Sequence, residues 1–337
     1  MRTYIVPSGC RTIDGLRRVD RPDPQPRSGQ VLVRIRAASL NRRDQAIVTG
    51  TYLGKPVAHD TIPLSDGAGE VMAVGDGVTR FTPGDRVVAV FAQTPPDGPP
   101  FAAKEPLGSP LDGTLADQMA VYEDGLVSIP EGLSFEEAAC LPCAAVTAWN
   151  ALMVTGTPVK AGDTVLVLGT GGVSMFALQF AKAAGARVIA TSSSDEKLER
   201  VKALGASDGV NYKRAPDWHK EVMKLTGGRG VDCVVEVGGV GTLERSFESL
   251  AACGKACLIG VLTGRSAEIS PYALMWKQAH LHGIRVGDRD MFEQMNRAID
   301  TNAIRPIIDR IFPFDEAVAA YRYQDAGKFI GKIVIGT

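Results

Sequence analysis

The chain has 337 residues, of which 45% are hydrophobic and 22% are charged, and its formal net charge is −1. This composition excludes a disordered or collagen-like chain, and the near-neutral charge without a basic run argues against nucleic-acid binding. The chain has six cysteines and lacks an apolar run of ~18 residues, so we expect a reduced, cytoplasmic protein of about two domains without a membrane span.

The first part of the chain, to about residue 130, predicts a small and irregular β domain. Residues 31–37 alternate as a half-buried strand should, and further strands are predicted at 69–75 and 85–90. The proline-rich stretch 94–100 is expected to form an exposed loop.

From residue 162 onward, predicted strands alternate with predicted helices. The unbroken apolar run 165–168 is typical of a strand covered on both faces. One helical pattern ends at Gly185, and another begins with a capping box at Ser193 and ends at Gly205. Further strands are predicted at residues 188–191, 231–237, 256–259 and 331–335, with helices at 291–299 and from 313. This alternation predicts an α/β fold with a parallel, doubly wound sheet.

The strongest chemical signal is the glycine-rich turn between the strand at 165–168 and the helix that follows it. Gly169, Gly171, Gly172 and Val173 stand where a dinucleotide-binding fingerprint has its phosphate-contacting residues. Gly171 allows close approach of a pyrophosphate, which the free N–H groups of the helix start would bind. Ser174 replaces the third glycine, a position that governs helix packing more than phosphate contact. The alternative is an ordinary strand–helix turn.

At this point the chain resembles the medium-chain dehydrogenase/reductase superfamily, specifically its zinc-free, quinone-oxidoreductase-like branch. The matching motifs, in the expected order, are Leu40-Asn41-x-x-Asp44, residues 62–71, 83–87 and 141–149, the glycine turn and residues 331–334. The resemblance implies a GroES-like, β-rich substrate domain formed by residues 1–130 and 285–337 around a central Rossmann domain of residues 131–284. It places the active site in the cleft between the two.

Zinc-dependent relatives carry metal ligands at three places where this chain has Asn41, Ser65 and Cys143. One thiol cannot hold a catalytic zinc that needs three protein ligands, so no metal site is expected. A four-cysteine site formed by Cys140 and Cys143 with Cys253 and Cys257 is the alternative, but buried, inert thiols fit these positions better. The four histidines are interpreted as core or surface residues.

For the chemistry, the resemblance implies that Asn41 lies near the nicotinamide and can donate a hydrogen bond to the substrate oxygen. It implies that Asp44 holds the same turn in place and that Tyr52 lies at the cleft as a donor, with a surface tyrosine as the alternative. Thr147 matches a residue near the nicotinamide, with a core-packing role as the alternative. Ala46 stands where quinone reductases often carry a second tyrosine.

The cofactor is predicted to be NADPH. An NAD enzyme has an acid at the end of the second strand of the nucleotide-binding fold, where this chain has Ser192 followed by Ser193. A serine does not repel a 2′-phosphate, and Lys197 can reach the same group. The resemblance implies that Tyr212 also lies beside the adenosine phosphate. The resemblance adds further cofactor contacts, which are Gly260, Val261, Leu262, Ile284 and Val286.

We therefore expect an NADPH-dependent oxidoreductase that transfers hydride, without zinc, to an α,β-unsaturated carbonyl or a quinone. One alternative is an alcohol dehydrogenase or ketone reductase that acts on the C=O group, and another is a non-catalytic NADPH-binding protein. A small-molecule substrate is the expected partner. The resemblance also suggests a homodimer through an edge strand near residues 256–261.

Overall fold

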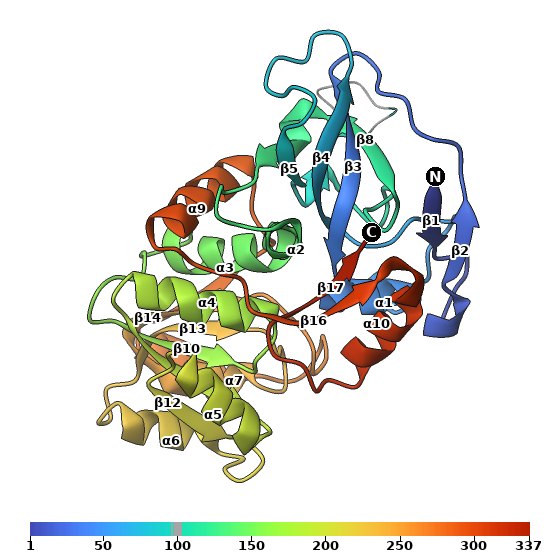
Figure 1. Ribbon diagram of the computed structural model, residues 1–337. Coiled ribbons are helices and arrows are strands. Elements are labelled where there is room, and N and C mark those ends of the chain that lie inside the picture. The colour runs from blue at the N-terminus through green and yellow to red at the C-terminus, as the bar shows by residue number, and fades with distance from the viewer. Residues whose placement is uncertain (96, 98–102) are drawn as a thin grey trace. The chain divides into compact units, whose positions relative to one another are not determined.

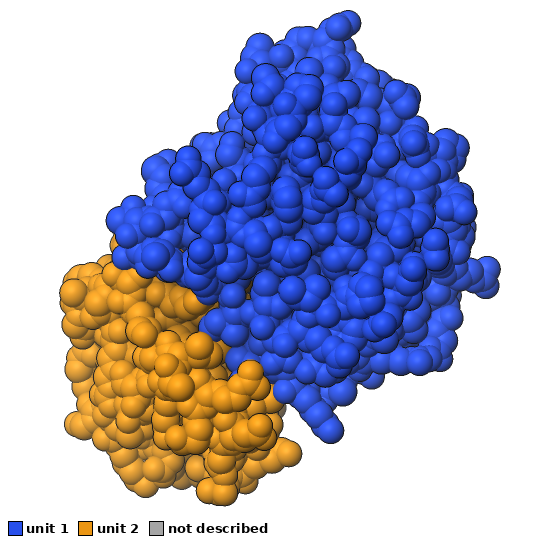
Figure 2. All heavy atoms as spheres, viewed as in Figure 1, with its two compact units in different colours: residues 1–146, 288–337 blue, residues 147–287 orange. Residues whose placement is uncertain are grey.

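The computed structural model describes residues 1–95, 97 and 103–337, so residues 96 and 98–100 of the proline-rich stretch lie outside the described residues. The chain divides into a terminal unit, residues 1–146 with 288–337, and a central unit, residues 147–287 (Figure 2). The predicted α/β fold with a GroES-like part and a parallel Rossmann-like part is confirmed. None of the helices in the described part of the chain has the length and hydropathy that crossing a membrane requires.

The terminal unit is organised around a sheet to which both ends of the chain contribute (Figure 1). Among the described residues its strands run in the order β16 (Ile308–Pro313), β17 (Lys332–Gly336), β3 (Gln30–Ser39), β4 (Asp66–Val74), β5 (Arg86–Ala89) and β9 (Leu126–Ser128), with β8 (Gln118–Tyr122) also on β3. Only the β16–β17 pair of these described strands is parallel. Strand β17, near the C-terminus, therefore lies directly against β3.

Short elements surround this sheet. The remaining strands are β1 (Arg2–Ile5) with β2 (Arg17–Asp20), and β6 (Ala92–Gln93) with β7 (Glu105–Pro106). The helices are α1 (Arg42–Val48), α2 (Phe135–Ala139), α9 (Arg289–Thr301) and α10 (Ala317–Asp325). Single turns of 3₁₀-helix lie at Ile13–Gly15, Tyr52–Gly54, Glu123–Gly125 and Phe314–Glu316, and a π-helical turn at Leu141–Ala145.

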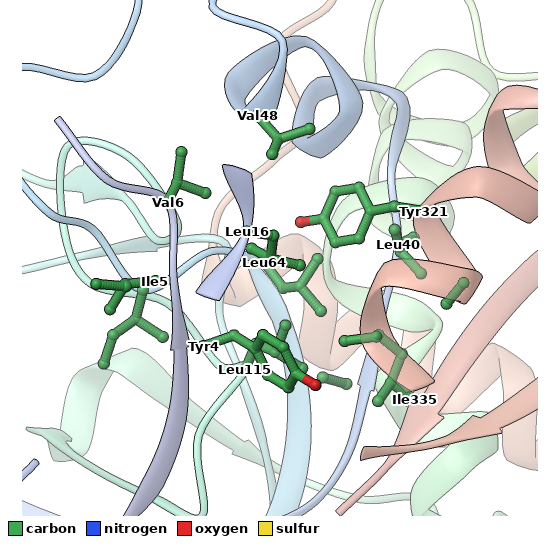
Figure 3. Packing of buried hydrophobic residues seen from close by; sticks show 14 of the residues in the cluster. Tyr4, Ile5, Val6, Leu16, Leu40, Val48, Leu64, Leu115, Tyr321 and Ile335 are labelled. Atoms are coloured by element: carbon green, nitrogen blue, oxygen red, sulfur yellow. The ribbon is translucent and has the colours of Figure 1, made fainter. Parts of the chain in front are cut away.

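One core of the terminal unit is shared by its N-terminal and C-terminal segments. Figure 3 shows Tyr4 and Leu16 from the start of the chain beside Leu64, Tyr321 and Ile335. Tyr321, on α10, is fully buried. Each buried aliphatic side chain contributes about 1.5–3 kcal/mol relative to exposure, so this shared core ties both ends of the chain into one unit.

The predicted domain boundary near residue 130 differs from the observed one at 146. Helix α2 packs on β3 and β4, and the Ser39 hydroxyl donates a hydrogen bond to the Ala139 carbonyl at 2.8 Å. The Arg86 guanidinium donates to the Leu133 carbonyl at 2.5 Å. These contacts hold residues 131–146 in the terminal unit. They join residues far apart in sequence, so the change in composition near residue 130 does not reveal them. The second boundary, predicted at 285, lies at 288.

The central unit is a parallel sheet with helices between successive strands (Figure 1). Its described strands run in the order β12 (Asp208–Asn211), β11 (Arg187–Ser192), β10 (Thr164–Leu168), β13 (Val231–Glu236), β14 (Leu250–Leu258) and β15 (His280–Gly283). Its helices are α3 (Val146–Trp149), α4 (Gly172–Ala183), α5 (Asp195–Ala203), α6 (Trp218–Leu225), α7 (Leu243–Ser249) and α8 (Tyr272–Trp276). Helix α3 begins at the boundary between the units, and a π-helical turn at Asn150–Val154 follows it. The strand order reverses between β10 and β13, which is where doubly wound sheets bind their ligands.

The edge strand of this sheet is not the one that the sequence predicted. Residues Ala256, Cys257 and Leu258 of β14 pair in parallel with Leu281, His282 and Gly283 of β15. Strand β14 is therefore interior, and β15 forms the edge. The error arises because β15 is a four-residue segment without the continuous apolar run by which the other strands were recognised.

Candidate active site and cofactor-binding turn

The turn after β3 carries the first predicted catalytic residues. Asn41 precedes α1, and its backbone N–H donates to Asp44 Oδ2 at 2.7 Å, so the Asp44 carboxyl closes the first turn of the helix. Asp44 is fully buried, and this burial raises its pKa to about 6, against the opposing effect of the neighbouring Arg43 charge.

The side chain of Asn41 belongs to a closed ring of four buried polar groups. The Lys332 ammonium donates to Asn41 Oδ1 at 2.6 Å, and Asn41 Nδ2 donates to Ser65 Oγ across a longer 3.4 Å. Ser65 Oγ donates to Asp66 Oδ1 at 2.8 Å, and Asp66 Oδ2 lies 3.6 Å from the Lys332 ammonium. We call these four residues, Asn41, Ser65, Asp66 and Lys332, the polar ring.

Strand pairing brings the polar ring together. Ser39, at the end of β3, lies opposite Asp66 of β4 on one side and Val334 of β17 on the other. The chain enters β17 through Gly331, whose φ is +77°, and a Cβ there would lie 2.2 Å from the Ile307 carbonyl oxygen. This entry is therefore restricted to glycine, and it delivers Lys332 to the end of β3.

The backbone of Cys143 contacts the polar ring. Cys143 is the third residue that stands where zinc-dependent relatives carry a metal ligand. Its N–H donates to Asp66 Oδ2 at 3.3 Å. Burial raises the pKa of the Cys143 thiol well above its usual range and that of Cys140 to about 12, so both are protonated thiols at neutral pH. In residues 1–95, 97 and 103–337, no group of three or more His, Cys, Asp or Glu side chains could hold a metal ion.

The sequence predicts buried thiols at Cys140, Cys143, Cys253 and Cys257. This prediction is wrong for Cys253, which is exposed. It has a φ of +59° within β14, where the pairing with β13 is irregular between Val231 and Cys233. The irregularity turns this residue outward.

Tyr52 is held by a residue that the sequence did not single out. The Arg43 guanidinium lies 5.1 Å from the centre of the Tyr52 ring and 5.0 Å from that of Phe91. It also donates to the carbonyl oxygens of Leu107 at 2.7 Å and Ser109 at 3.0 Å. Arg43 thus fixes the half-buried Tyr52 ring through a cation–π contact.

The glycine turn of the central unit leaves room for a ligand. A Cβ added at Gly171 would meet nothing within 4 Å, so packing within the described protein does not require this glycine, whereas the φ of +71° at Gly169 favours glycine for its backbone alone. Helix α4 begins at Gly172 and Val173 without a capping side chain among the described residues, which leaves its first N–H groups for an anion. Ser174 donates to the Leu168 carbonyl at 2.7 Å and so links the helix to β10. The turn fits a dinucleotide pyrophosphate.

At the end of β11, Ser192 occupies the position of the ribose-binding acid. Its hydroxyl oxygen accepts from the Ser194 N–H at 3.2 Å, and the Tyr212 N–H donates to the Ser192 carbonyl at 3.0 Å. Ser193 lies between the two serines, and Lys197 lies in the first turn of α5. The nearby Asp195 carboxylate is bound by Asn211 and paired with Arg214, a cation that the sequence analysis missed.

The remaining predicted cofactor residues follow the ends of β14 and β15 or lie in α3. Val261 and Leu262 are exposed, whereas the side chains of Ile284, Val286 and Thr147 are buried. Gly260 is required by packing, because a Cβ there would lie 2.3 Å from the Val237 carbonyl oxygen. The structure therefore gathers Asn41, Asp44 and Tyr52 in the terminal unit and the other cofactor residues in the central unit.

Glu236, at the end of β13, is another residue that was not predicted from the sequence. Its buried carboxylate accepts from the backbone N–H groups of Gly238 at 2.6 Å and Gly239 at 3.0 Å, and from the Thr242 hydroxyl at 2.7 Å. Glu236 therefore shapes the turn that follows β13. The signal was present in the sequence as an acid at the end of an apolar run.

Two family models match consecutive parts of this chain. Residues 27–131 match the alcohol dehydrogenase GroES-like domain family, and residues 172–301 match the zinc-binding dehydrogenase family. A zinc-type alcohol dehydrogenase-like protein of Schizosaccharomyces pombe is 44% identical over 98% of both chains. The quinone oxidoreductase of Rattus norvegicus is 29% identical over 93% of this chain and 90% of its own.

The solved structures that span the whole of this chain include an alcohol dehydrogenase and an NADPH complex. An NAD-dependent alcohol dehydrogenase is 33% identical, with a TM-score of 0.91 and full coverage of both chains. A mycobacterial protein complexed with NADPH is 29% identical, with a TM-score of 0.83 and full coverage of both chains. With both family domains present in order and relatives matched over almost their full length, the chain belongs to the medium-chain dehydrogenase/reductase superfamily and is an NAD(P)-dependent oxidoreductase.

Proposed function

We propose that the chain is an NADPH-dependent reductase that works without zinc and delivers hydride to the β-carbon of an α,β-unsaturated carbonyl or to a quinone. The observation that carries this proposal is the polar ring, which occupies the position of a metal site with an ammonium, an amide, a hydroxyl and a carboxylate. When bound to the central unit, the dihydronicotinamide supplies the hydride.

The terminal unit supplies hydrogen-bond donors for the oxygen of the substrate. When hydride adds to an enone, negative charge develops on the carbonyl oxygen, and a fixed donor lowers the energy of that enolate. Asn41 Nδ2 is such a donor, since it carries two protons and Ser65 Oγ accepts at most one of them. Tyr52, held by Arg43, is a second donor and a route for the proton that completes the reduction.

An alcohol dehydrogenase or ketone reductase is the second candidate, because two of the similar proteins are named as alcohol dehydrogenases or alcohol dehydrogenase-like. Direct reduction of a C=O group in that class uses strong polarisation by a metal. Here the three ligand positions hold Asn41, Ser65 and Cys143, and the Lys332 ammonium lies against Asn41. A positive charge at this place opposes cation binding, which favours the enone or quinone reaction.

A panel of substrates separates the two candidates. We expect NADPH oxidation with simple enones or quinones and little with ketones, and an unchanged rate after dialysis against a chelator. Elemental analysis should give well under one zinc per chain. Stoichiometric zinc together with chelator-sensitive alcohol oxidation would show that the second candidate is correct.

Replacement of Asn41 by aspartate tests the donor. Asn41→Asp keeps an acceptor for Lys332 but removes the Nδ2 protons, so kcat for enone reduction should fall by about 100–1000-fold, the effect of losing one oxyanion donor. The matched control is Asn302→Asp, the same change at an exposed position after α9, which should leave kcat unchanged. An Asn41→Asp enzyme with wild-type kcat would exclude the donor role.

The choice of cofactor depends on Ser192. We expect a preference for NADPH over NADH of about tenfold or more in kcat/KM, since each charged hydrogen bond contributes ~1.5–3 kcal/mol. Ser192→Asp places a carboxylate against the 2′-phosphate and should erode or reverse this preference. Ser207→Asp, at an exposed position before β12, is the control. Equal kcat/KM values for both cofactors in the wild-type enzyme would contradict the proposal.

We also propose a homodimer, formed through the edge strand β15 of the central unit. This strand presents unpaired backbone groups, and its Leu281 is 42% exposed. Light scattering at micromolar concentration should give a dimer mass, and Leu281→Asp should give a monomer. Leu204→Asp, at an equally exposed apolar residue after α5, should remain dimeric. A monomeric wild-type chain would rule out this assembly.

A further inference from the structure

Lys332 has no role in the function proposed above beyond its position in the polar ring. Its side chain is almost fully buried, and its ammonium has three partners: the Leu40 carbonyl at 2.8 Å, Asn41 Oδ1 at 2.6 Å and Asp66 Oδ2 at 3.6 Å. A buried ammonium costs several kcal/mol unless its charge and its three protons are matched. The Leu40 carbonyl and Asn41 Oδ1 each accept one proton, and the Asp66 carboxylate, too distant at 3.6 Å for a hydrogen bond, supplies the opposite charge.

The ammonium decides which way the Asn41 amide faces. A carboxamide has an accepting oxygen and a donating nitrogen, whereas an ammonium has donors alone. The opposite orientation would set the amide NH2 group against the ammonium at 2.6 Å. Two groups of donors would then face each other, with the partial positive charge of the NH2 hydrogens against the ammonium charge. Asn41 therefore turns Oδ1 toward Lys332 and Nδ2 away from it.

Ser65 reinforces the same orientation from the other side. The Ser65 hydroxyl proton goes to the Asp66 carboxylate at 2.8 Å, so its oxygen is an acceptor for Asn41 Nδ2. Every hydrogen bond in the polar ring then runs in one direction, from the ammonium through the amide and the hydroxyl to the carboxylate. Such chains strengthen each member, because a polarised acceptor becomes a better donor at its other end.

We propose that Lys332 is a positioning residue, which fixes the Asn41 carboxamide with its oxygen inward and polarises its NH2 group as a donor for the substrate oxygen. The part that concerns the substrate rests on the proposed function. The orientation of the amide does not, since it follows from the hydrogen bonds of the polar ring alone.

The protection that this orientation gives the Asn41 NH2 group is measured by NMR on the full chain with ¹⁵N-labelled asparagine. The chain has five asparagines, and the amide pair that disappears in Asn41→Asp is that of Asn41. In Lys332→Met this pair should exchange with solvent at least about tenfold faster, the loss expected for one hydrogen bond. The Asn150 pair, which donates to the Val286 carbonyl at 2.7 Å, serves as the internal control and should not change. An unchanged exchange rate of the Asn41 pair overturns the proposal.

A matched lysine separates positioning from the general loss of a buried charge. Lys255 is also buried, and its ammonium donates to the Thr155 carbonyl at 2.7 Å. Lys255→Met should lower the unfolding temperature but leave the Asn41 exchange rate and kcat unchanged. Lys332→Met should lower kcat by about 10–1000-fold while the Kd for NADPH stays within twofold. Equal effects of the two variants on kcat would contradict positioning.

A second pair of variants tests the same contact if Lys332→Met does not fold. Asn41→Asp retains an acceptor for the ammonium but loses the Nδ2 bond to Ser65, so it should unfold below the wild-type temperature. Asn41→Leu removes both contacts and should unfold at a clearly lower temperature than Asn41→Asp. An Asn41→Leu chain as stable as the wild type overturns the proposal. If the wild-type chain reduces neither enones nor quinones, the proposed function fails, but the exchange and unfolding measurements still decide the role of Lys332.

Discussion

The site of this protein depends on a buried ammonium that the last strand of the chain brings to the end of β3. Because Lys332 can only donate, its position sets the direction of every other hydrogen bond in the polar ring. Because it is buried, it also requires the Asp66 carboxylate nearby. Removing either charge would leave the other uncompensated, so the ring is retained or lost as a unit.

The same contact explains why both ends of the chain are needed in one unit. Strand β17 can reach β3 because α10 and the N-terminal strand share a core around Tyr321 and Tyr4 (Figure 3). The central unit, by contrast, builds the glycine turn of the proposed cofactor site locally, because the residues from β10 to α4 are continuous in sequence. The donor of the proposed reaction therefore rests on long-range packing, and the cofactor turn rests on local structure.

Features that depend on local sequence could be predicted, whereas features that depend on long-range packing could not. The α/β fold, the family and the glycine turn were predictable, because they follow from local periodicity and from motifs within a few residues of one another. Lys332 and Glu236 both lie in segments that the sequence predicts as strands, but spacing does not tell which charged residue becomes buried. Lys332 is 291 residues from Asn41, so the contact appears once β17 is placed beside β3. The edge strand β15 and the boundary at 146 were missed for a similar reason, because tertiary pairing fixes both.

The central claim, that Asn41 donates to the oxygen of the substrate with its amide fixed by Lys332, is tested most directly by a crystal structure of the chain with NADP⁺ and an unreactive enone analogue. We predict that the ligand oxygen lies about 3 Å from Asn41 Nδ2, with the Lys332 ammonium still on Asn41 Oδ1. A ligand oxygen bound elsewhere, with no contact to Asn41, or an amide turned the other way would contradict the claim.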